Sequence, residues 1–279
     1  MLDVEIPESL TCVRQRVKIF FVGVPKTGTK FFLNTVHPDD VIPQGHAYFK
    51  EISDHYAGFN GGNVLQNLED AKRELAKEGI KVIVISLVRN PYSMLHSLWN
   101  YKWSGTDDRS ISWNMKRGGT VSFDDFARAF RDPISPKARD EMGLHFSGFQ
   151  IAPNFSDFLY FQLFDDLGRF VPDFVIRMEC MSIGILQLQK HLGIRLTRSP
   201  SRSLSPEKVN GGASCPSSKY KEMYTADLIK FFSKQFSTEL DLFGYDFDGS
   251  TDDAAIISGA DIRREGEKYV SLSGFNSWQ

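Results

Sequence analysis

The chain has 279 residues, with 33 Lys plus Arg against 35 Asp plus Glu and a formal net charge of −2. This length suits one large α/β domain or two small ones with a sizeable core, and the charge balance gives no global field that would favour nucleic acid or an anionic membrane. The three cysteines (Cys12, Cys180 and Cys215) follow neither a metal-binding nor a disulfide pattern, so we expect reduced thiols in a cytoplasmic protein.

No linker, internal repeat or 18-residue apolar run divides the chain, and the N-terminus has no basic and apolar leader pattern. We therefore expect a single domain over residues 1–279 with no membrane anchor. Its core is expected at about 17–247. Residues 248–279 form a polar C-terminal tail to which we assign no fold.

The first element is a strand over residues 17–24, VKIFFVGV, a nearly continuous apolar run typical of a strand buried on both faces of a parallel sheet. Pro25 and Gly28 end the strand, and the apolar spacing from Phe31 predicts a helix directly after the loop. Such a strand, loop and helix bring backbone N–H groups and the positive end of a helix dipole to one point, which favours an anion.

The loop itself reads PKTGT, in which Lys26 adds a positive charge and Thr27 and Thr29 add hydroxyl donors. It does not fit the GxxxxGK[ST] pattern, because it has one Gly and its Lys comes before that Gly. The alternative interpretation is an ordinary strand-to-helix turn that happens to contain these residues.

Three further elements and a helix cap precede the next cluster of polar residues. They are a short extended piece at 41–44, an amphipathic helix over 65–78, its cap at Gly79, and a buried strand over 81–88. A strand, a helix and another strand imply a right-handed crossover and a parallel sheet.

Directly after the second strand the chain reads RNPYSMLHS. Asn90–Pro91 is a helix-start signal, so Arg89 is expected at the carboxyl edge of the sheet and Ser97 about two turns into the next helix. A guanidinium and a hydroxyl so placed suit a phosphate group. The alternative is an Arg at a strand end and a helix serine bonded to its own backbone.

The segment 99–122 has no periodicity and mixes three Trp with Lys, Arg and Gly. It is either a loop that binds a substrate, called the acceptor loop below, or a solvated connection. The candidate substrate contacts in it are Trp99, Trp103, Asp107 and Asp108. The remaining expected elements are a helix over 123–130, a helix over 156–167, a strand over 173–178, a helix over 183–192 ended by Gly193, and an amphipathic stretch over 219–243 ended by Gly244–Tyr245.

Together the segments PKTGT, RNPYSMLHS, VIRME and FGYDF resemble sulfotransferases that use 3′-phosphoadenosine 5′-phosphosulfate, most closely the carbohydrate and bacterial branch. The resemblance covers about residues 17–247 and implies a P-loop-like three-layer α/β fold with a central parallel β-sheet flanked by helices. Two positions depart from the family pattern: Lys30 stands where Thr or Ser is usual, and Met178 where an aromatic residue is usual.

The resemblance also implies the roles of the site residues. Residues 25–29 (Pro25, Lys26, Thr27, Gly28 and Thr29) would hold the 5′-phosphate, with the part played by Lys30 left open, and Arg89 and Ser97 would hold the 3′-phosphate. Lys26 would also offset charge on the leaving phosphate.

A general base must accept the proton of the acceptor, and His46 follows the loop at the distance where the resembling enzymes place a Glu or His. An imidazole of ordinary pKa, about 6.5, is largely neutral near pH 7, as a base should be. His55 and Glu51 are the next candidates, and a surface or core histidine is the alternative interpretation of His46. The scheme requires no metal.

The sequence thus predicts a sulfotransferase that moves a sulfuryl group to a hydroxyl or amine of a small metabolite or saccharide. One alternative is a catalytically silent protein of the same fold that binds nucleotide. A second, less favoured, is a P-loop kinase. The acceptor and the oligomeric state do not follow from the sequence.

Overall fold

We describe the fold from a computed structural model of the chain. The structure describes residues 16–24, 27–36, 38–44, 64–99, 122–124, 127–128, 163–165, 169–194, 196 and 218–270. Within these ranges, no helix is long and apolar enough to cross a membrane.

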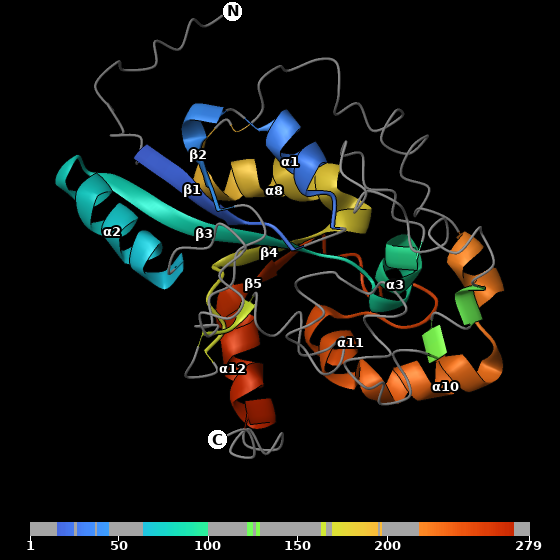
Figure 1. Cartoon of the computed structure of the whole chain (residues 1–279). Coiled ribbons are helices and arrows are strands. Elements are labelled where there is room, and N and C mark those ends of the chain that lie inside the picture. The colour runs from blue at the N-terminus through green and yellow to red at the C-terminus, as the bar shows by residue number, and fades with distance from the viewer. Residues whose placement is uncertain are drawn as a thin grey trace, which may run out of the picture.

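A five-stranded sheet of order β2-β1-β3-β4-β5 organises the molecule (Figure 1). Its strands are β1 (Arg16–Val22), β2 (Val41–Pro43), β3 (Ile80–Val88), β4 (Phe174–Arg177) and β5 (Ile256–Ser258). The first four run parallel, whereas β5 pairs antiparallel with β4. The fold is therefore α/β as predicted, but the sheet is mixed and not purely parallel.

The three longer strands lie where apolar runs predicted them. In β3 every residue except Lys81 is buried, and the second half of β1 is buried completely. Helices cover both faces of these central strands, which is why their sequences are continuously apolar instead of alternating.

One face of the sheet packs against α1 (Thr29–Thr35) and α8 (Met181–Leu192), which lie on the same side in Figure 1. Phe21 of β1 stacks on Phe32 of α1 with ring centroids 4.4 Å apart. Ile85 and Ile176 bring β3 and β4 into the same buried cluster as Ile185 of α8. The helix predicted over 183–192 is confirmed, and Gly193 ends it in a left-handed conformation at φ 64°.

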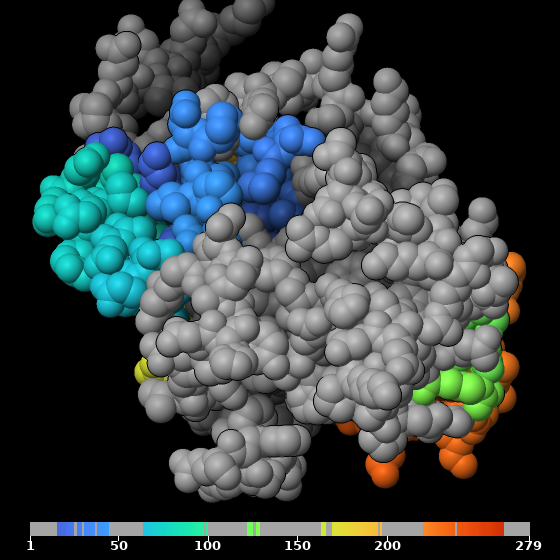
Figure 2. Space-filling view, in the orientation of Figure 1, coloured from blue at the N-terminus to red at the C-terminus, as the bar shows by residue number. Residues whose placement is uncertain are grey.

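The other face packs against α2 (Val64–Lys77), where Phe20 and Val84 of the sheet meet Val64 and Leu68. Gly79, at φ 69°, follows this helix as predicted. Figure 2 shows α2 in teal beside the blue residues of the 16–44 segment, where the Asn67 side chain donates to the Gln44 side chain over 3.2 Å.

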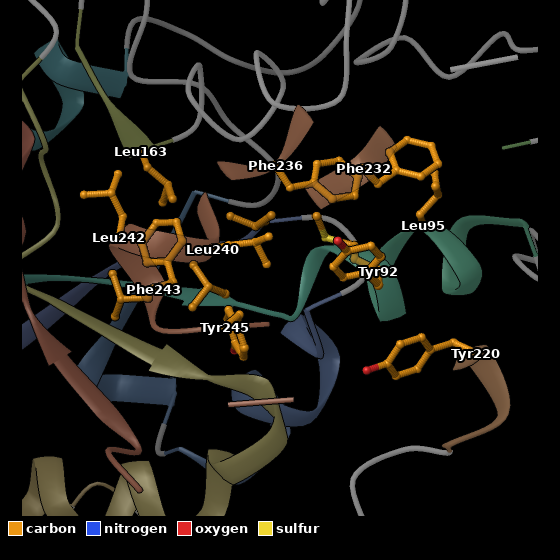
Figure 3. Packing of buried hydrophobic residues seen from close by; sticks show 14 of the residues in the cluster. Tyr92, Leu95, Leu163, Tyr220, Phe232, Phe236, Leu240, Leu242, Phe243 and Tyr245 are labelled. Carbon is orange, nitrogen blue, oxygen red and sulfur yellow. The ribbon is translucent and has the colours of Figure 1, made fainter. Parts of the chain in front are cut away.

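The rest of that face belongs to a large aromatic cluster beyond the end of β3 (Figure 3). It is built by α3 (Pro91–Trp99), the 3-10 helix η5 (Ser218–Met223), α10 (Ala226–Gln235) and α11 (Ser237–Phe243). The predicted amphipathic stretch 219–243 is thus three helical pieces. Residues 123–124 and 127–128, green in Figure 2, lie beside α10, where Arg128 and Asp227 are 3.6 Å apart.

Residues 249–270, the described part of the polar segment for which no fold was expected, are structured. They contain β5 and then α12 (Gly259–Val270), whose Ile262 is buried in the aromatic cluster. Two short 3-10 helices, η1 (Pro38–Asp40) and η4 (Met178–Cys180), complete the described elements.

Candidate functional site at the carboxyl edge of the sheet

The loop after β1 and the chain after β3 begin side by side. Val22 is paired with Ser86, whose hydroxyl donates to the Val22 carbonyl over 2.8 Å. Val24 and Val88, each two residues later in the chain than this pair, belong to the same buried cluster. Neighbouring parallel strands have their carboxyl ends at the same edge of a sheet. The segment Thr27–Thr29 after β1 and Arg89 after β3 therefore both begin at that edge.

The two threonines of the loop close its turn. The Thr27 hydroxyl, fully buried, donates to the Val24 carbonyl over 2.6 Å, and the Thr27 N–H points to the same oxygen. The Thr29 hydroxyl reaches that carbonyl over a longer 3.3 Å and is only partly buried. Both hydroxyls therefore stabilise the loop turn, and their predicted role as phosphate donors stays a prediction.

Gly28 sits in a left-handed conformation at φ 85° and precedes α1 directly. A Cβ built on it would lie 2.8 Å from Met181 Cε and 3.3 Å from Met178 Cγ. The left-handed backbone favours glycine here, whereas the nearest atom, Met181 Cε, is the end of a flexible side chain that can shift. The contact also places the loop against the end of β4, so three parallel strands contribute to this edge.

Arg89 follows β3 as predicted, and its guanidinium is oriented by a serine that the prediction did not name. Arg89 Nε donates to the Ser93 hydroxyl over 2.6 Å, and Ser93 is buried. Ser97, the predicted partner, lies one helical turn beyond Ser93 on the same face of α3 and is partly buried. Arg89, Ser93 and Ser97 therefore form a row at intervals of four residues.

Asn90 begins α3 as the helix-start signal predicted: its side-chain oxygen accepts the Tyr92 N–H over 3.0 Å. Its amide group donates to the Asp246 carbonyl over 2.7 Å, and its backbone N–H donates to Glu179 Oε1 over 2.9 Å. The other carboxylate oxygen of Glu179 accepts the Tyr245 hydroxyl over 2.7 Å. These bonds join RNPYS, VIRME and FGYDF into one unit.

Burial, followed by the charge of Glu179 and the hydrogen bond to it, raises the pKa of Tyr245 well above its ordinary value. The Tyr245 phenol is therefore neutral at physiological pH and keeps its proton to donate to Glu179.

A buried arginine at the end of β4 holds the segments that follow α11. Arg177 ends β4 with 2% of its surface exposed, and its Nε donates to the Phe243 carbonyl over 3.0 Å. Its other nitrogens donate to Ser250, Asp252 and the Ala254 carbonyl. The hydrogen bonds from Arg177 lower the pKa of Asp252 below its ordinary value.

Two tyrosines of the 219–243 stretch, Tyr220 and Tyr224, have structural partners. Tyr224 donates to the Tyr92 carbonyl of α3 over 3.0 Å, and Tyr220 donates to the Phe247 carbonyl. Their rings meet edge to face in the aromatic cluster, and burial raises the pKa of Tyr224 well above its ordinary value. Tyr224 thus joins α3 to the chain after η5, and Tyr220 joins η5 to the segment after α11.

The charge of Arg89 affects the pKa of His96. Burial and, second, the positive charge of Arg89 lower the pKa of this histidine, so its imidazole is neutral at pH 7. Its ring packs with Trp99 and Phe123, at centroid distances of 5.8 Å to each. Trp99, one of the candidate acceptor contacts, is thereby part of the packing around α3.

Several predicted site residues lie outside the described part of the chain. These are Pro25, Lys26, His46 and its alternatives Glu51 and His55, and the acceptor-loop residues Trp103, Asp107 and Asp108. Of Lys30 only the backbone is described, in the first turn of α1. Among the described residues, Thr27, Gly28 and Thr29 follow β1, and Arg89 follows the adjacent strand β3. Ser93 bonds to Arg89, and Glu179 bonds to Asn90, which the prediction did not name.

Comparison of the chain with models of protein families and with curated proteins finds no match.

Proposed function

We propose that this protein is a sulfotransferase that uses 3′-phosphoadenosine 5′-phosphosulfate. The observation that supports the proposal is that β1 and β3 are adjacent parallel strands, so that residues 27–29 and Arg89 follow neighbouring strand ends at one edge of the sheet. Ligands of open α/β sheets bind at this edge, and the two phosphates of a 3′,5′-bisphosphate need two separate anchoring points.

The 3′-phosphate is the distinguishing feature, because ATP and GTP lack it. Arg89 would supply the charge-assisted donors and Ser97 a hydroxyl, while the bond from Arg89 Nε to the Ser93 hydroxyl orients the guanidinium. The turn at Gly28 would present backbone N–H groups to the 5′-phosphate, with Lys26 beside it.

The reaction follows from the sequence assignment of the remaining residues. The acceptor oxygen or nitrogen attacks the sulfur, the bond from sulfur to the phosphate oxygen breaks, and adenosine 3′,5′-bisphosphate leaves. His46 would take the proton of the acceptor, and Lys26 would offset the charge on the departing phosphate. The P-loop-like form of the fold belongs to the same proposal.

A calorimetric titration with adenosine 3′,5′-bisphosphate and ATP tests the cofactor. We expect micromolar or tighter binding of the bisphosphate and a clear preference for it over ATP. Arg89→Ala should weaken bisphosphate binding at least tenfold, since a charge-assisted bond contributes about 1.5–3 kcal/mol. Arg128→Ala, which removes an arginine paired with Asp124 and Asp227, is the matched control and should bind like the wild type. A preference for ATP would overturn the proposal.

The catalytic assignments are tested separately, by turnover. Lys26→Ala and His46→Ala should both abolish sulfuryl transfer, but only Lys26→Ala should weaken nucleotide binding. Retained transfer in His46→Ala would remove the base assignment and leave the cofactor assignment intact.

A further inference from the structure

The Glu179 carboxylate accepts two hydrogen bonds from groups on two other segments of the chain. One donor is the backbone N–H of Asn90, 2.9 Å away, and the other is the hydroxyl of Tyr245, 2.7 Å away. Glu179 lies in η4, immediately beyond β4, so this one side chain joins the end of β4 to the start of α3 and to the segment after α11. The proposed reaction gives Glu179 no role.

The Asn90 backbone carries Arg89 on its amino side. Asn90 is 2% exposed, and its side-chain bonds to Asp246 and Tyr92 fix one side of the residue while Glu179 holds its N–H. The peptide that joins Arg89 to Asn90 contains this N–H. Any rotation of that peptide would therefore break the bond to Glu179 and turn the direction in which Arg89 leaves the backbone.

We infer that Glu179 is a positioning residue for Arg89: by holding the Arg89–Asn90 peptide, it aims the guanidinium at the 3′-phosphate. The identity of the ligand rests on the proposed function, but the control of the Arg89 direction rests on the geometry alone. Charged partners of this kind raise affinity chiefly when the donor is already oriented before the ligand arrives.

A matched pair of variants separates positioning from general stability. Glu179→Ala removes the acceptor for the Asn90 N–H. Asp173→Ala removes an equivalent acceptor at the other end of the same strand pair, where Asp173 Oδ2 accepts the Val84 N–H over 2.8 Å. Both variants lose a carboxylate bond to a backbone amide between β3 and β4, but only the first lies next to Arg89.

The first measurement is the ratio of the dissociation constants of adenosine 5′-monophosphate and adenosine 3′,5′-bisphosphate, which isolates the contribution of the 3′-phosphate. We expect Glu179→Ala to lower this ratio about tenfold, and Asp173→Ala to leave it at the wild-type value even where urea unfolding shows a similar loss of stability. A purely structural role would lower both affinities together and leave the ratio unchanged.

The second measurement needs no ligand. The Nε–H signal of Arg89 in a nitrogen-15 NMR spectrum, assigned by its loss in Arg89→Lys, reports the bond to Ser93. We expect it to shift and to exchange faster with solvent in Glu179→Ala but not in Asp173→Ala.

A wild type that does not prefer the bisphosphate would refute the proposed function, and the Arg89 signal would then decide the positioning inference alone. An unchanged Arg89 signal in Glu179→Ala, or an equal change in Asp173→Ala, would overturn the inference. If Glu179→Ala does not fold, Glu179→Asp keeps the charge with a shorter reach and should move the signal in the same direction. A wild-type signal in Glu179→Asp would count against the inference.

Discussion

Arg89 illustrates how a side chain can be recognised from the sequence while its local partner is missed. The spacing to Ser97 pointed to a phosphate, but the guanidinium bonds to Ser93, four residues along the chain. The signal was present, because a serine at this spacing after a strand lies on the same face of the following helix. Orientation by Ser93 and binding through Ser97 are compatible, since both serines belong to one row.

Replacement of Ser93 tests this division of roles. Ser93→Ala removes the bond that orients Arg89 and leaves the charge in place, so we expect bisphosphate affinity to fall several-fold, less than in Arg89→Ala. Calorimetric titration of the two variants measures the difference. An equal loss in both would mean that Ser93 contacts the ligand itself or holds α3 as a whole.

His96 reports the charge around Arg89. Burial and the Arg89 cation lower its pKa, and a bound phosphate would offset that cation. We therefore expect adenosine 3′,5′-bisphosphate to raise the His96 pKa toward its ordinary value, so that the bisphosphate binds more tightly as the pH falls through this range. The C2 proton of His96, followed by NMR across pH with and without ligand, measures the shift. A pKa that stays constant on saturation would place the phosphate elsewhere.

At the scale of elements, the sequence predicted those that are long and buried. β1, β3 and β4 are apolar runs with helices on both faces, and α2 and α8 have clear apolar stripes, so each was predicted within two residues of its observed ends. β5 was missed because it is a three-residue edge strand of intermediate burial. α12 was missed because its segment is largely polar, with Ile262 as the buried anchor.

The missed C-terminal elements depend on a close backbone contact. A Cβ built on Gly259, the first residue of α12, would lie 1.9 Å from the Pro172 carbonyl oxygen. Gly259→Ala should therefore destabilise the protein by about 3 kcal/mol, because the obstructing atoms are backbone. Gly79→Ala is the control: Gly79 has only a left-handed backbone and open space, and its replacement should cost about 1 kcal/mol. Urea unfolding compares the two, and equal losses would contradict this packing.

The candidate site was less predictable than the sheet because its bonds join residues far apart in sequence. Arg89 and the PKTGT turn could be placed at strand ends by pattern alone. The bonds from the Asn90 N–H to Glu179 and from Arg177 to Asp252 connect positions 89 and 75 residues apart, respectively, and no local pattern specifies them. The VIRME segment marked the place but not the partners.

At the scale of the whole molecule, residues 249–270 are part of the fold. Ser250, Asp252 and Ala254 accept hydrogen bonds from the buried Arg177, and β5 adds a strand to the sheet. Without them a fully buried guanidinium would lose most of its acceptors, which costs on the order of several kcal/mol.

Truncation after Asp248 tests this. We expect the shortened chain to lose its cooperative thermal transition, followed by circular dichroism, because that loss is comparable to the whole stability of a domain. A wild-type transition in the shorter chain would show that a core ending near residue 247 is sufficient.

The central claim is that the turn after β1 and the end of β3 form one bisphosphate site, and NMR titration of the wild-type protein tests it most directly. We predict that the Gly28 amide and Arg89 Nε–H signals shift together, with the same half-saturation, as adenosine 3′,5′-bisphosphate is added, and that ATP does not shift the Arg89 signal. If the bisphosphate shifts only one of the two signals, or neither, the two segments do not form the site proposed for them.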